Sequence, residues 1–280
     1  MKYVDIHGHV HFKAYDVDRV DVISRCIENQ VGVINVGTDF ESSVSAVELA
    51  KQNENMWAII GLHPVHTGCS YNDPAETGIK DEGMSDIKSY QNFDATKFSE
   101  LAKEKKVVAI GECGLDYFHS EPEDMKKQRE EFEKQIIFAN EINKPLMLHI
   151  RNAKNGNSAY AEAVQILETH ANVRANFHFF AGTTEDLKKI LDIGGTVSFT
   201  GVITFTSNYD DLVRYVPMDR VMSETDCPYV SPTPYRGKRN EPSYVVEVVK
   251  SIARIRNADV ESVSSALLAN AKDFFSLENS

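Results

Sequence analysis

The sequence predicts a single-domain α/β protein folded as a (β/α)8 TIM barrel, and three observations support this prediction. Eight short apolar segments alternate with amphipathic stretches along the chain, as the strands and helices of a barrel do. The length of 280 residues is typical of one barrel, and no low-complexity linker divides it. No glycine-rich dinucleotide fingerprint follows the first strand, so a closed barrel is favoured over a doubly wound sheet.

The strands are expected where the sequence has unbroken apolar runs, because parallel strands are covered on both faces. These runs are residues 3–7, 31–37, 56–62, 107–111, 145–150, 173–178, 196–200 and 220–225. Helices are expected between them, for example at residues 20–30, 123–143 and 159–169.

One connection is longer than the others and rich in polar residues, Gly and Pro. It runs from about residue 64 to residue 93, after the third strand. Loops of this length are usually functional or mobile, so we expect an insertion lying over the active end of the barrel. A tolerated surface insertion is the alternative.

Composition limits the classes of protein that fit. The formal charge of -12 argues against a broad basic surface for nucleic acid, but it allows a nucleic-acid enzyme whose acidic site is neutralised by divalent metals. The four cysteines, Cys26, Cys69, Cys113 and Cys227, show no CxxC pairing and are expected to be reduced. No apolar run approaches a membrane span, and we expect a cytoplasmic monomer.

Candidate metal ligands follow the predicted strands. Catalytic residues of such barrels lie at the C-terminal ends of the strands. Five of the nine histidines fall there, together with Glu112 and Asp226: they are His7, His9, His63, His149 and His178. His7 and His9 are two residues apart on a strand, so both side chains point the same way and can bind one ion. Imidazoles with carboxylates suit Zn, Mn, Ni or Fe, and Mg is tolerated.

The same pattern suggests roles within a two-metal site. Glu112 can bridge two ions because a carboxylate has two oxygens. His149 and His178 would hold the second ion. Asp226 would complete the first ion and accept a proton from the attacking water. Glu112 and Asp226 are therefore the expected catalytic residues, and Asp5 is expected behind them, where it would fix a histidine tautomer.

Substrate contacts are expected from the surrounding loops. His63 and Arg151 would hold phosphate oxygens, and Asp116 and Tyr117 would position a phosphate or a base. The loop after the eighth strand is the most basic stretch, and its Arg236 and Lys238 are expected to bind flanking phosphates. For each of these residues the alternative is a structural salt bridge, a cap or a solvated loop.

The motifs DIHGH, GLHP, GECGLDY, LHIR, FHFF-AGT, SETDCPY and RGKRNEP resemble, in this order, those of the TatD family of metal-dependent hydrolases. The resemblance implies a TIM barrel, two divalent metal ions and DNase or related phosphodiester hydrolysis. It assigns metal-ligand roles to His7, His9, Glu112, His149, His178 and Asp226. Phe179 departs from the family pattern, which often has cysteine there.

The residues leave other activities open. The same two-metal site would serve a deacylase acting on aminoacyl-tRNA or an amidohydrolase acting on a small molecule. A phosphodiesterase for cyclic or dinucleotides is a further candidate, and a non-catalytic binding protein is disfavoured by the intact ligand set. Among nucleic acids, DNA is expected as substrate in preference to RNA.

Overall fold

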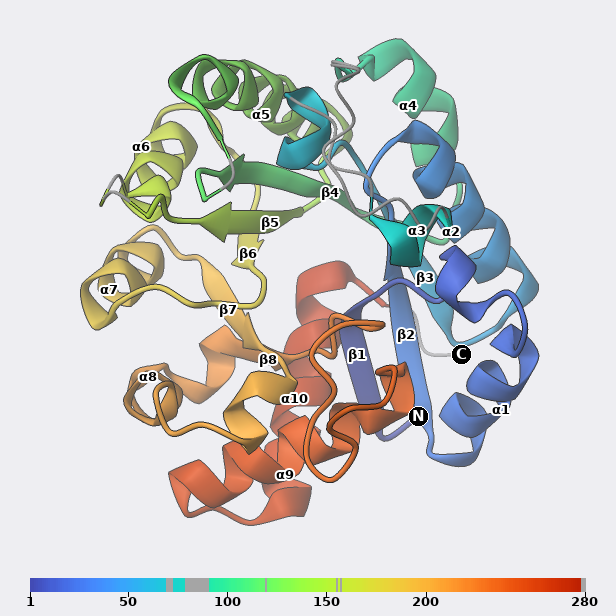
Figure 1. The fold of residues 1–280 in the computed structure, drawn as a ribbon. Helices are drawn as coiled ribbons and strands as arrows, with labels where there is room; N and C mark the ends of the chain where they lie inside the picture. Colours follow the sequence, from blue (N-terminus) through green and yellow to red (C-terminus); the bar gives the residue numbers. More distant parts are fainter. Residues whose placement is uncertain (69–72, 79–90, 119, 155, 157, 278–280) are drawn as a thin grey trace.

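The computed structural model confirms the predicted barrel. Eight parallel strands form one sheet in the order β1 to β8, and a bridge between Gly8 and Cys227 brings the chain beyond β8 against β1. Helices surround this sheet on the outside (Figure 1). The structure describes residues 1–68, 73–78, 91–118, 120–154, 156 and 158–277.

The strands lie close to the predicted positions, with one clear difference. They are β1 (Tyr3–Gly8), β2 (Val31–Val36), β3 (Met56–Ile60), β4 (Val107–Asp116), β5 (Leu146–Arg151), β6 (Ala175–Phe177), β7 (Thr196–Phe199) and β8 (Val221–Ser223). β4 continues to Asp116, whereas the sequence predicted its end at residue 111. Pairing with β5 resumes after a register shift, from Cys113 opposite Leu148 to Asp116 opposite Arg151. Gly111 and Gly114 hid this continuation, because glycine inside a run usually weakens a strand.

The helices follow the strands as a barrel requires. They are α1 (Arg19–Glu28), α2 (Phe40–Gln52), α3 (Pro74–Thr77), α4 (Ala95–Ala102), α5 (Pro122–Ile142), α6 (Ala159–His170), α7 (Thr184–Asp192), α8 (Asp210–Tyr215), α9 (Val245–Arg256) and α10 (Val260–Phe275). Short 3-10 segments are η1 (Lys13–Tyr15), η2 (Pro64–Thr67), η3 (Gly201–Thr204), η4 (Met218–Arg220) and η5 (Pro242–Tyr244). The long α5 begins with Pro122 and a capping box that includes Asp124, and it ends at Asn143 in the left-handed conformation.

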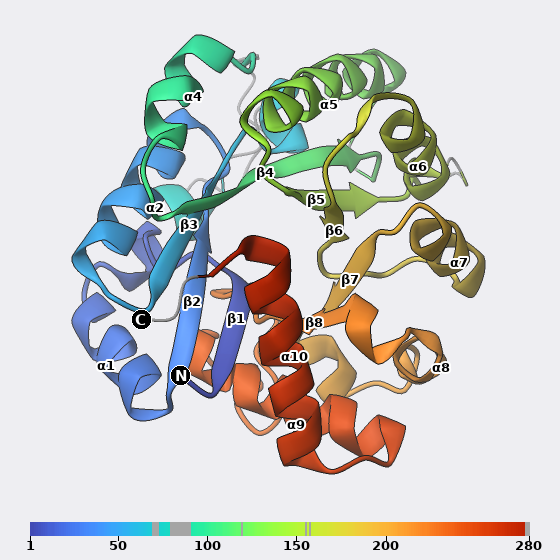
Figure 2. The same ribbon diagram turned by 180° about the vertical axis from the view of Figure 1, so that it is seen from behind.

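Two apolar layers hold the barrel together. The larger layer lies between the strands and the surrounding helices. The smaller layer fills the barrel interior, for example with Ile6, Ile34 and Ile59, and it continues into Phe274 and Phe275 at the end of α10. Figure 2 shows α10 crossing the barrel from behind. Because apolar packing closes this end, the buried polar residues are left to gather at the other end, where the strands finish.

The expected insertion is described only in part. Residues 69–72 and 79–90 lie outside the described residues. The described parts are η2, α3 and the chain before α4, and Gln91 is joined to the barrel by a hydrogen bond from its side chain to Asp39. Cys69 also lies outside the described residues, whereas Cys26, Cys113 and Cys227 are buried and unpaired, as predicted for reduced thiols.

None of the helices that the structure describes has both the length and the apolar content needed to cross a membrane.

Candidate metal centre and active site

The carboxylate of Glu112 on β4 is the centre of the site. Its Oε1 lies 2.9 Å from His178 Nε2, 3.0 Å from His149 Nδ1 and 3.2 Å from His63 Nε2. Its Oε2 lies 3.2 Å from His7 Nε2. These histidines come from the ends of four other strands, so the barrel itself brings them together. Glu112 is almost completely buried.

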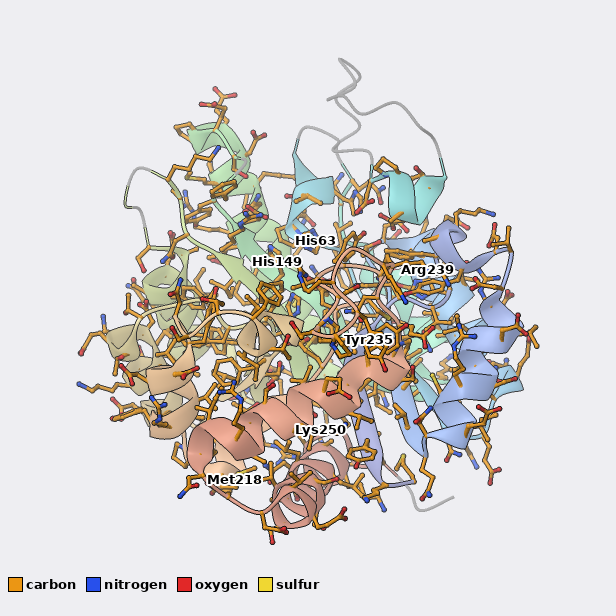
Figure 3. The ribbon with its side chains drawn as sticks, turned by 60° about the horizontal axis from the view of Figure 1, so that its bottom comes forward. His63, His149, Met218, Tyr235, Arg239 and Lys250 are labelled. Carbon is orange, nitrogen blue, oxygen red and sulfur yellow. The ribbon has the colours of Figure 1, made fainter. Side chains whose placement is uncertain are left out.

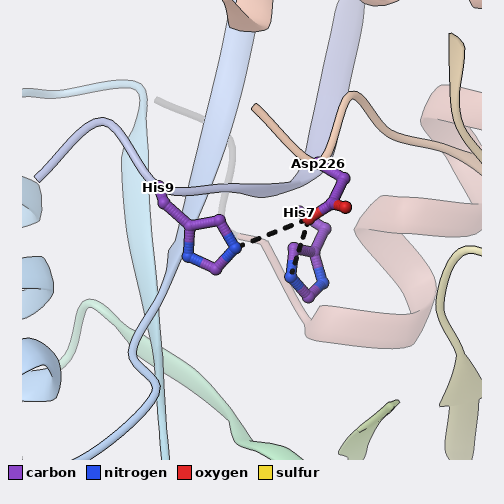
Figure 4. A group of neighbouring side chains, drawn as sticks. All are labelled: His7, His9 and Asp226. Carbon is purple, nitrogen blue, oxygen red and sulfur yellow. Dashed lines mark ion pairs between the residues drawn. The ribbon is translucent and has the colours of Figure 1, made fainter. Parts of the chain in front are cut away.

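Asp226 faces the other side of the histidine pair at the end of β1. Its Oδ1 lies 3.6 Å from His9 Nε2 and 3.8 Å from His7 Nε2 (Figure 4). Asp226 has φ of 55°, a left-handed conformation that Asp tolerates better than most residues. Its backbone N–H donates to the His7 carbonyl oxygen at 2.8 Å, which holds it in this position.

Three histidines have an acceptor behind the ring, on the side away from the centre. His9 Nδ1–H donates to the Val36 carbonyl oxygen at 2.7 Å. His149 Nε2 lies 3.0 Å from Asp116 Oδ2, and His178 Nδ1 lies 3.2 Å from Glu224 Oε2. An acceptor behind a ring keeps the proton on that nitrogen and leaves the opposite nitrogen for a metal ion.

Glu224 is a site residue that the sequence analysis missed. It is fully buried and accepts a hydrogen bond from the Phe179 N–H on Oε1, besides its contact with His178 on Oε2. The His7 ring stacks on the His178 ring with centroids 3.9 Å apart, and its Nδ1 lies 3.7 Å from Glu224 Oε2. Glu224 therefore supports two of the candidate ligands. Its spacing of two residues before Asp226 is the signal that could have revealed it.

The residues at this site fit divalent cations. Both ring nitrogens of His7 are buried and make no hydrogen bond to any described residue, although oxygens of Glu112 and Asp226 lie within 4 Å. A buried polar atom without a partner is costly, and a bound cation would provide one. Three compatible groups of donors occur among the described residues: His7, His9 and Asp226; His7, His178 and Glu224; and His63, Glu112 and His149.

Glu112 and the histidines around it shift one another's pKa values. Burial disfavours the charged carboxylate, but His178, His63 and His7 outweigh it and hold the pKa of Glu112 well below its usual range. Burial likewise disfavours the imidazolium of His149, but hydrogen bonds to Asp116 and Glu112 raise its pKa to about 9. Protons and metal ions therefore compete for the same imidazole nitrogens.

His63 differs from the other histidines around Glu112. Its Nδ1 accepts a hydrogen bond from the Val65 backbone N–H at 3.1 Å, and burial lowers its pKa to about 4. The proton of the neutral ring is therefore on Nε2, which faces the centre as a donor. Figure 3 shows His63 beside His149, and their ring centroids are 4.4 Å apart. This orientation suits contact with an anionic substrate better than direct metal binding.

A cleft of about 570 Å³ opens above these side chains. Its floor is formed by the candidate ligands, among them His9, Glu112 and Asp226. Its walls include His66, Asp73 and Glu76 from the described parts of the insertion, and Arg151, Tyr209 and Tyr229 from other loops.

Two sequence expectations about residues next to the ligands need correction. Tyr117 was expected at the substrate, but it packs outward into the layer between barrel and helices, where its hydroxyl donates to Glu162 Oε2 at 2.7 Å. Asp5 was expected to fix a histidine ring, but its carboxylate accepts from the Thr225 N–H and hydroxyl and from the His7 backbone N–H. Asp5 therefore joins the end of β8 to β1 through the backbone.

The remaining predicted substrate contacts fall in three places. Asp116 lines the cleft, but its carboxylate holds His149. Arg151 lines the cleft with its guanidinium 3.9 Å over the Phe118 ring. Arg236 donates to the Ser231 carbonyl oxygen, and neither it nor the exposed Lys238 is among the described residues that line the cleft.

Comparison with known proteins agrees with this geometry. The family model described as TatD related DNase matches residues 4–276. The uncharacterized metal-dependent hydrolase YabD of Bacillus subtilis is 34% identical over 277 residues, which cover 97% of this chain and 98% of that protein. The protein named 3'-5' ssDNA/RNA exonuclease TatD of Pantoea ananatis is 32% identical, over 93% of this chain and 94% of its own. The crystal structure of YJJV, a TatD homologue from Escherichia coli, shares the fold with a TM-score of 0.81 at 23% identity, covering 99% of both chains. This chain therefore belongs to the TatD related DNase family.

Proposed function

We propose that this protein is a metal-dependent nuclease that hydrolyses phosphodiester bonds of nucleic acid at the C-terminal end of the barrel. One observation carries the proposal. His9, His149 and His178 each have an acceptor behind the ring and the opposite nitrogen turned toward a buried carboxylate of Glu112 or Asp226. This is the arrangement of a metal site with supported histidine ligands.

The proposed site holds two divalent cations, with the sequence-predicted ligands. His7, His9 and Asp226 form one group of donors, and Glu112 with His149 belongs to another. Cations bound to such donors supply Lewis acidity, which activates water and neutralises charge on a phosphate group. The ligand set contains imidazoles and carboxylates, so Zn, Mn, Ni, Fe and Mg are the candidates to compare.

The chain's own residues provide the proton and phosphate contacts. Asp226 lines the cleft and acts as the base that takes the proton of the attacking water. His63 offers its Nε2–H to a phosphate oxygen. The side chains of Glu224 and Asp116 keep His178 and His149 in the tautomers that face the centre. The apolar layer beneath the site closes the opposite end of the barrel, so water does not reach the site from that end.

The substrate class follows from the family and from the cleft. The family is described as DNase, and the Pantoea relative is named for single-stranded DNA and RNA, so we propose single-stranded nucleic acid with DNA preferred. We further expect a monomer in the cytoplasm. Light scattering of the purified protein tests the first of these two expectations, and cell fractionation tests the second.

The deciding experiment is hydrolysis of labelled oligonucleotides before and after metal removal. The protein is treated with EDTA, and Mg, Mn or Zn is then restored one at a time. We expect no cleavage after chelation and recovered cleavage with at least one metal, on DNA and RNA oligonucleotides labelled at either end. Full cleavage after exhaustive chelation, or hydrolysis of aminoacyl esters without cleavage of any oligonucleotide, would refute the proposal.

A further inference from the structure

A second group of positive charges lies beside the metal centre, at the ends of β4 and β5. The Arg151 guanidinium is 3.9 Å from the centre of the Phe118 ring, and the Lys154 Nζ is 4.2 Å from the same centre. The two cations therefore contact the same ring and lie near each other. The attraction of each cation to the ring holds it in place. Arg151 lines the cleft, and Lys154 is exposed.

In the part of the chain that the structure describes, neither Arg151 nor Lys154 forms an ion pair with a carboxylate. Other cations near the barrel rim do: Arg129 pairs with Glu162, and Arg239 pairs with Asp18. On a chain with formal charge -12, two neighbouring exposed cations with no carboxylate partner among the described residues favour an anionic ligand.

Another part of the cleft wall, formed by the insertion, carries carboxylates. Asp73 and Glu76, from the described part of the insertion, line it together with Tyr229. The Tyr229 hydroxyl donates to Asp73, and the Thr38 hydroxyl donates to Glu76, so both carboxylates are held at the wall. A polyanionic strand is attracted to the Arg151 side and repelled from the Asp73 side.

We infer that Arg151 and Lys154, held on Phe118, form a binding site for the backbone phosphate next to the scissile one, so that the substrate strand leaves the metal centre over the ends of β4 and β5. The inference rests on the proposed nuclease function. It adds Lys154 and Phe118 to the substrate contacts and assigns the strand a direction across the cleft. A phosphate between two cations held by a ring needs little reordering of their side chains on binding.

The test compares a dinucleotide, which has only the scissile phosphate, with a trinucleotide, which adds the neighbouring phosphate. Lys154→Ala and Lys154→Glu are the test variants, and Phe118→Leu removes the ring while keeping an apolar side chain. Lys97→Ala is the matched control, because Lys97 also lies over a ring, that of Phe40 at 6.0 Å, but on the outer helix α4. Thermal unfolding of each variant checks that it is folded.

For Lys154→Ala we expect the ratio of kcat/KM for the trinucleotide to that for the dinucleotide to fall by about two- to fivefold. Lys154→Glu lowers the ratio further, because it places a like charge beside the phosphate. The slope of log KM against log salt concentration for the trinucleotide becomes shallower by about 0.7 per lost contact. Lys97→Ala keeps the wild-type ratio and slope.

Two results would overturn the inference, and they differ from each other. If the wild-type protein cleaves both substrates and Lys154→Glu keeps the wild-type ratio and salt slope, the phosphate site is wrong and the nuclease function stands. If the wild-type protein cleaves neither substrate with any of the metals, the proposed function and the phosphate site both fail.

Discussion

Substitution of Glu224 by Gln is expected to weaken metal binding by about 10- to 100-fold, or about 1.4–2.7 kcal/mol. The magnitude follows from the contacts of this buried side chain. Its two oxygens serve different groups: Oε2 faces His178 Nδ1, and Oε1 accepts from the Phe179 N–H. Glutamine has one oxygen and one NH2 group, so one of the two donors would face another donor. The negative charge that makes the His178 ring a better ligand is also lost.

The affinity is measured by competition with a chromogenic chelator, with Mn or Zn, at fixed pH. Glu131→Gln is the matched control, because Glu131 is equally buried and accepts the Phe93 backbone N–H at 2.7 Å, but it lies on α5 away from the centre. That variant loses folding stability while keeping its metal affinity. Wild-type metal affinity in a folded Glu224→Gln protein would refute the reasoning about support behind the histidines.

Three further predictions test other parts of the site. Asp226→Asn lowers kcat by about 10²–10⁴-fold at saturating metal, because an amide cannot take the proton, and a kcat near that of the wild type would make Asp226 structural. The carboxylates of Asp116 and Glu112 raise the pKa of His149 from 6.5 to about 9. In metal-free protein the interaction of the His149 imidazolium with these carboxylates therefore stabilises the folded state fully below pH 6.5, and this stabilisation is lost as pH rises through 9. Metal affinity accordingly increases with pH up to about 9, because metal binding releases protons. Calorimetry of metal binding in two buffers of different ionisation enthalpy detects this release, and identical heats in both buffers would contradict it. Arg236→Ala with Lys238→Ala raises KM with little change in kcat, and only for oligonucleotides long enough to extend beyond the cleft; an unchanged KM for long substrates would leave this loop without a binding role.

The barrel could be predicted because its strands are unbroken apolar runs. A parallel strand with helices on one face and the barrel interior on the other has no polar face, and this pattern is visible in the sequence. Because the histidines and carboxylates follow these strands in the sequence, they could be placed at one rim of the barrel before any contact was known. The limit of β4 could not be predicted, because Gly111 and Gly114 interrupt the pattern although pairing with β5 continues.

Tyr117 was wrongly expected to contact the substrate because β4 was predicted to end at residue 111. Side chains alternate along a strand, so those of Glu112 and Asp116 point to one side of β4, and those of Cys113, Leu115 and Tyr117 point to the other. The structure places the second set in the outer apolar layer. Had β4 been extended to Asp116, the same alternation would have separated Tyr117 from the site.

Residues that act through another residue are harder to predict than ligands. Asp116 and Glu224 are carboxylates near the ends of strands, and Glu112 and Asp226 are carboxylates within or just after the same strands. Nothing in their residue type distinguishes the two roles. The distinction depends on which ring nitrogen each carboxylate faces. That depends on side-chain rotation and on the spacing of neighbouring strands, which the order of residues does not specify.

The same argument divides the histidines at the rim by function. His9 has a carbonyl oxygen behind its ring, that of Val36, so its proton stays on Nδ1 and Nε2 is free to bind a cation. His63 has a backbone N–H behind its ring, that of Val65, so its proton stays on Nε2 and faces the centre. A backbone acceptor behind His9 and a backbone donor behind His63 thus give two imidazole side chains opposite uses, one toward a metal ion and one toward an anion. The proposed function requires cations and a phosphate side by side, and the backbone, rather than the residue type, sets the direction of each imidazole proton for these two uses.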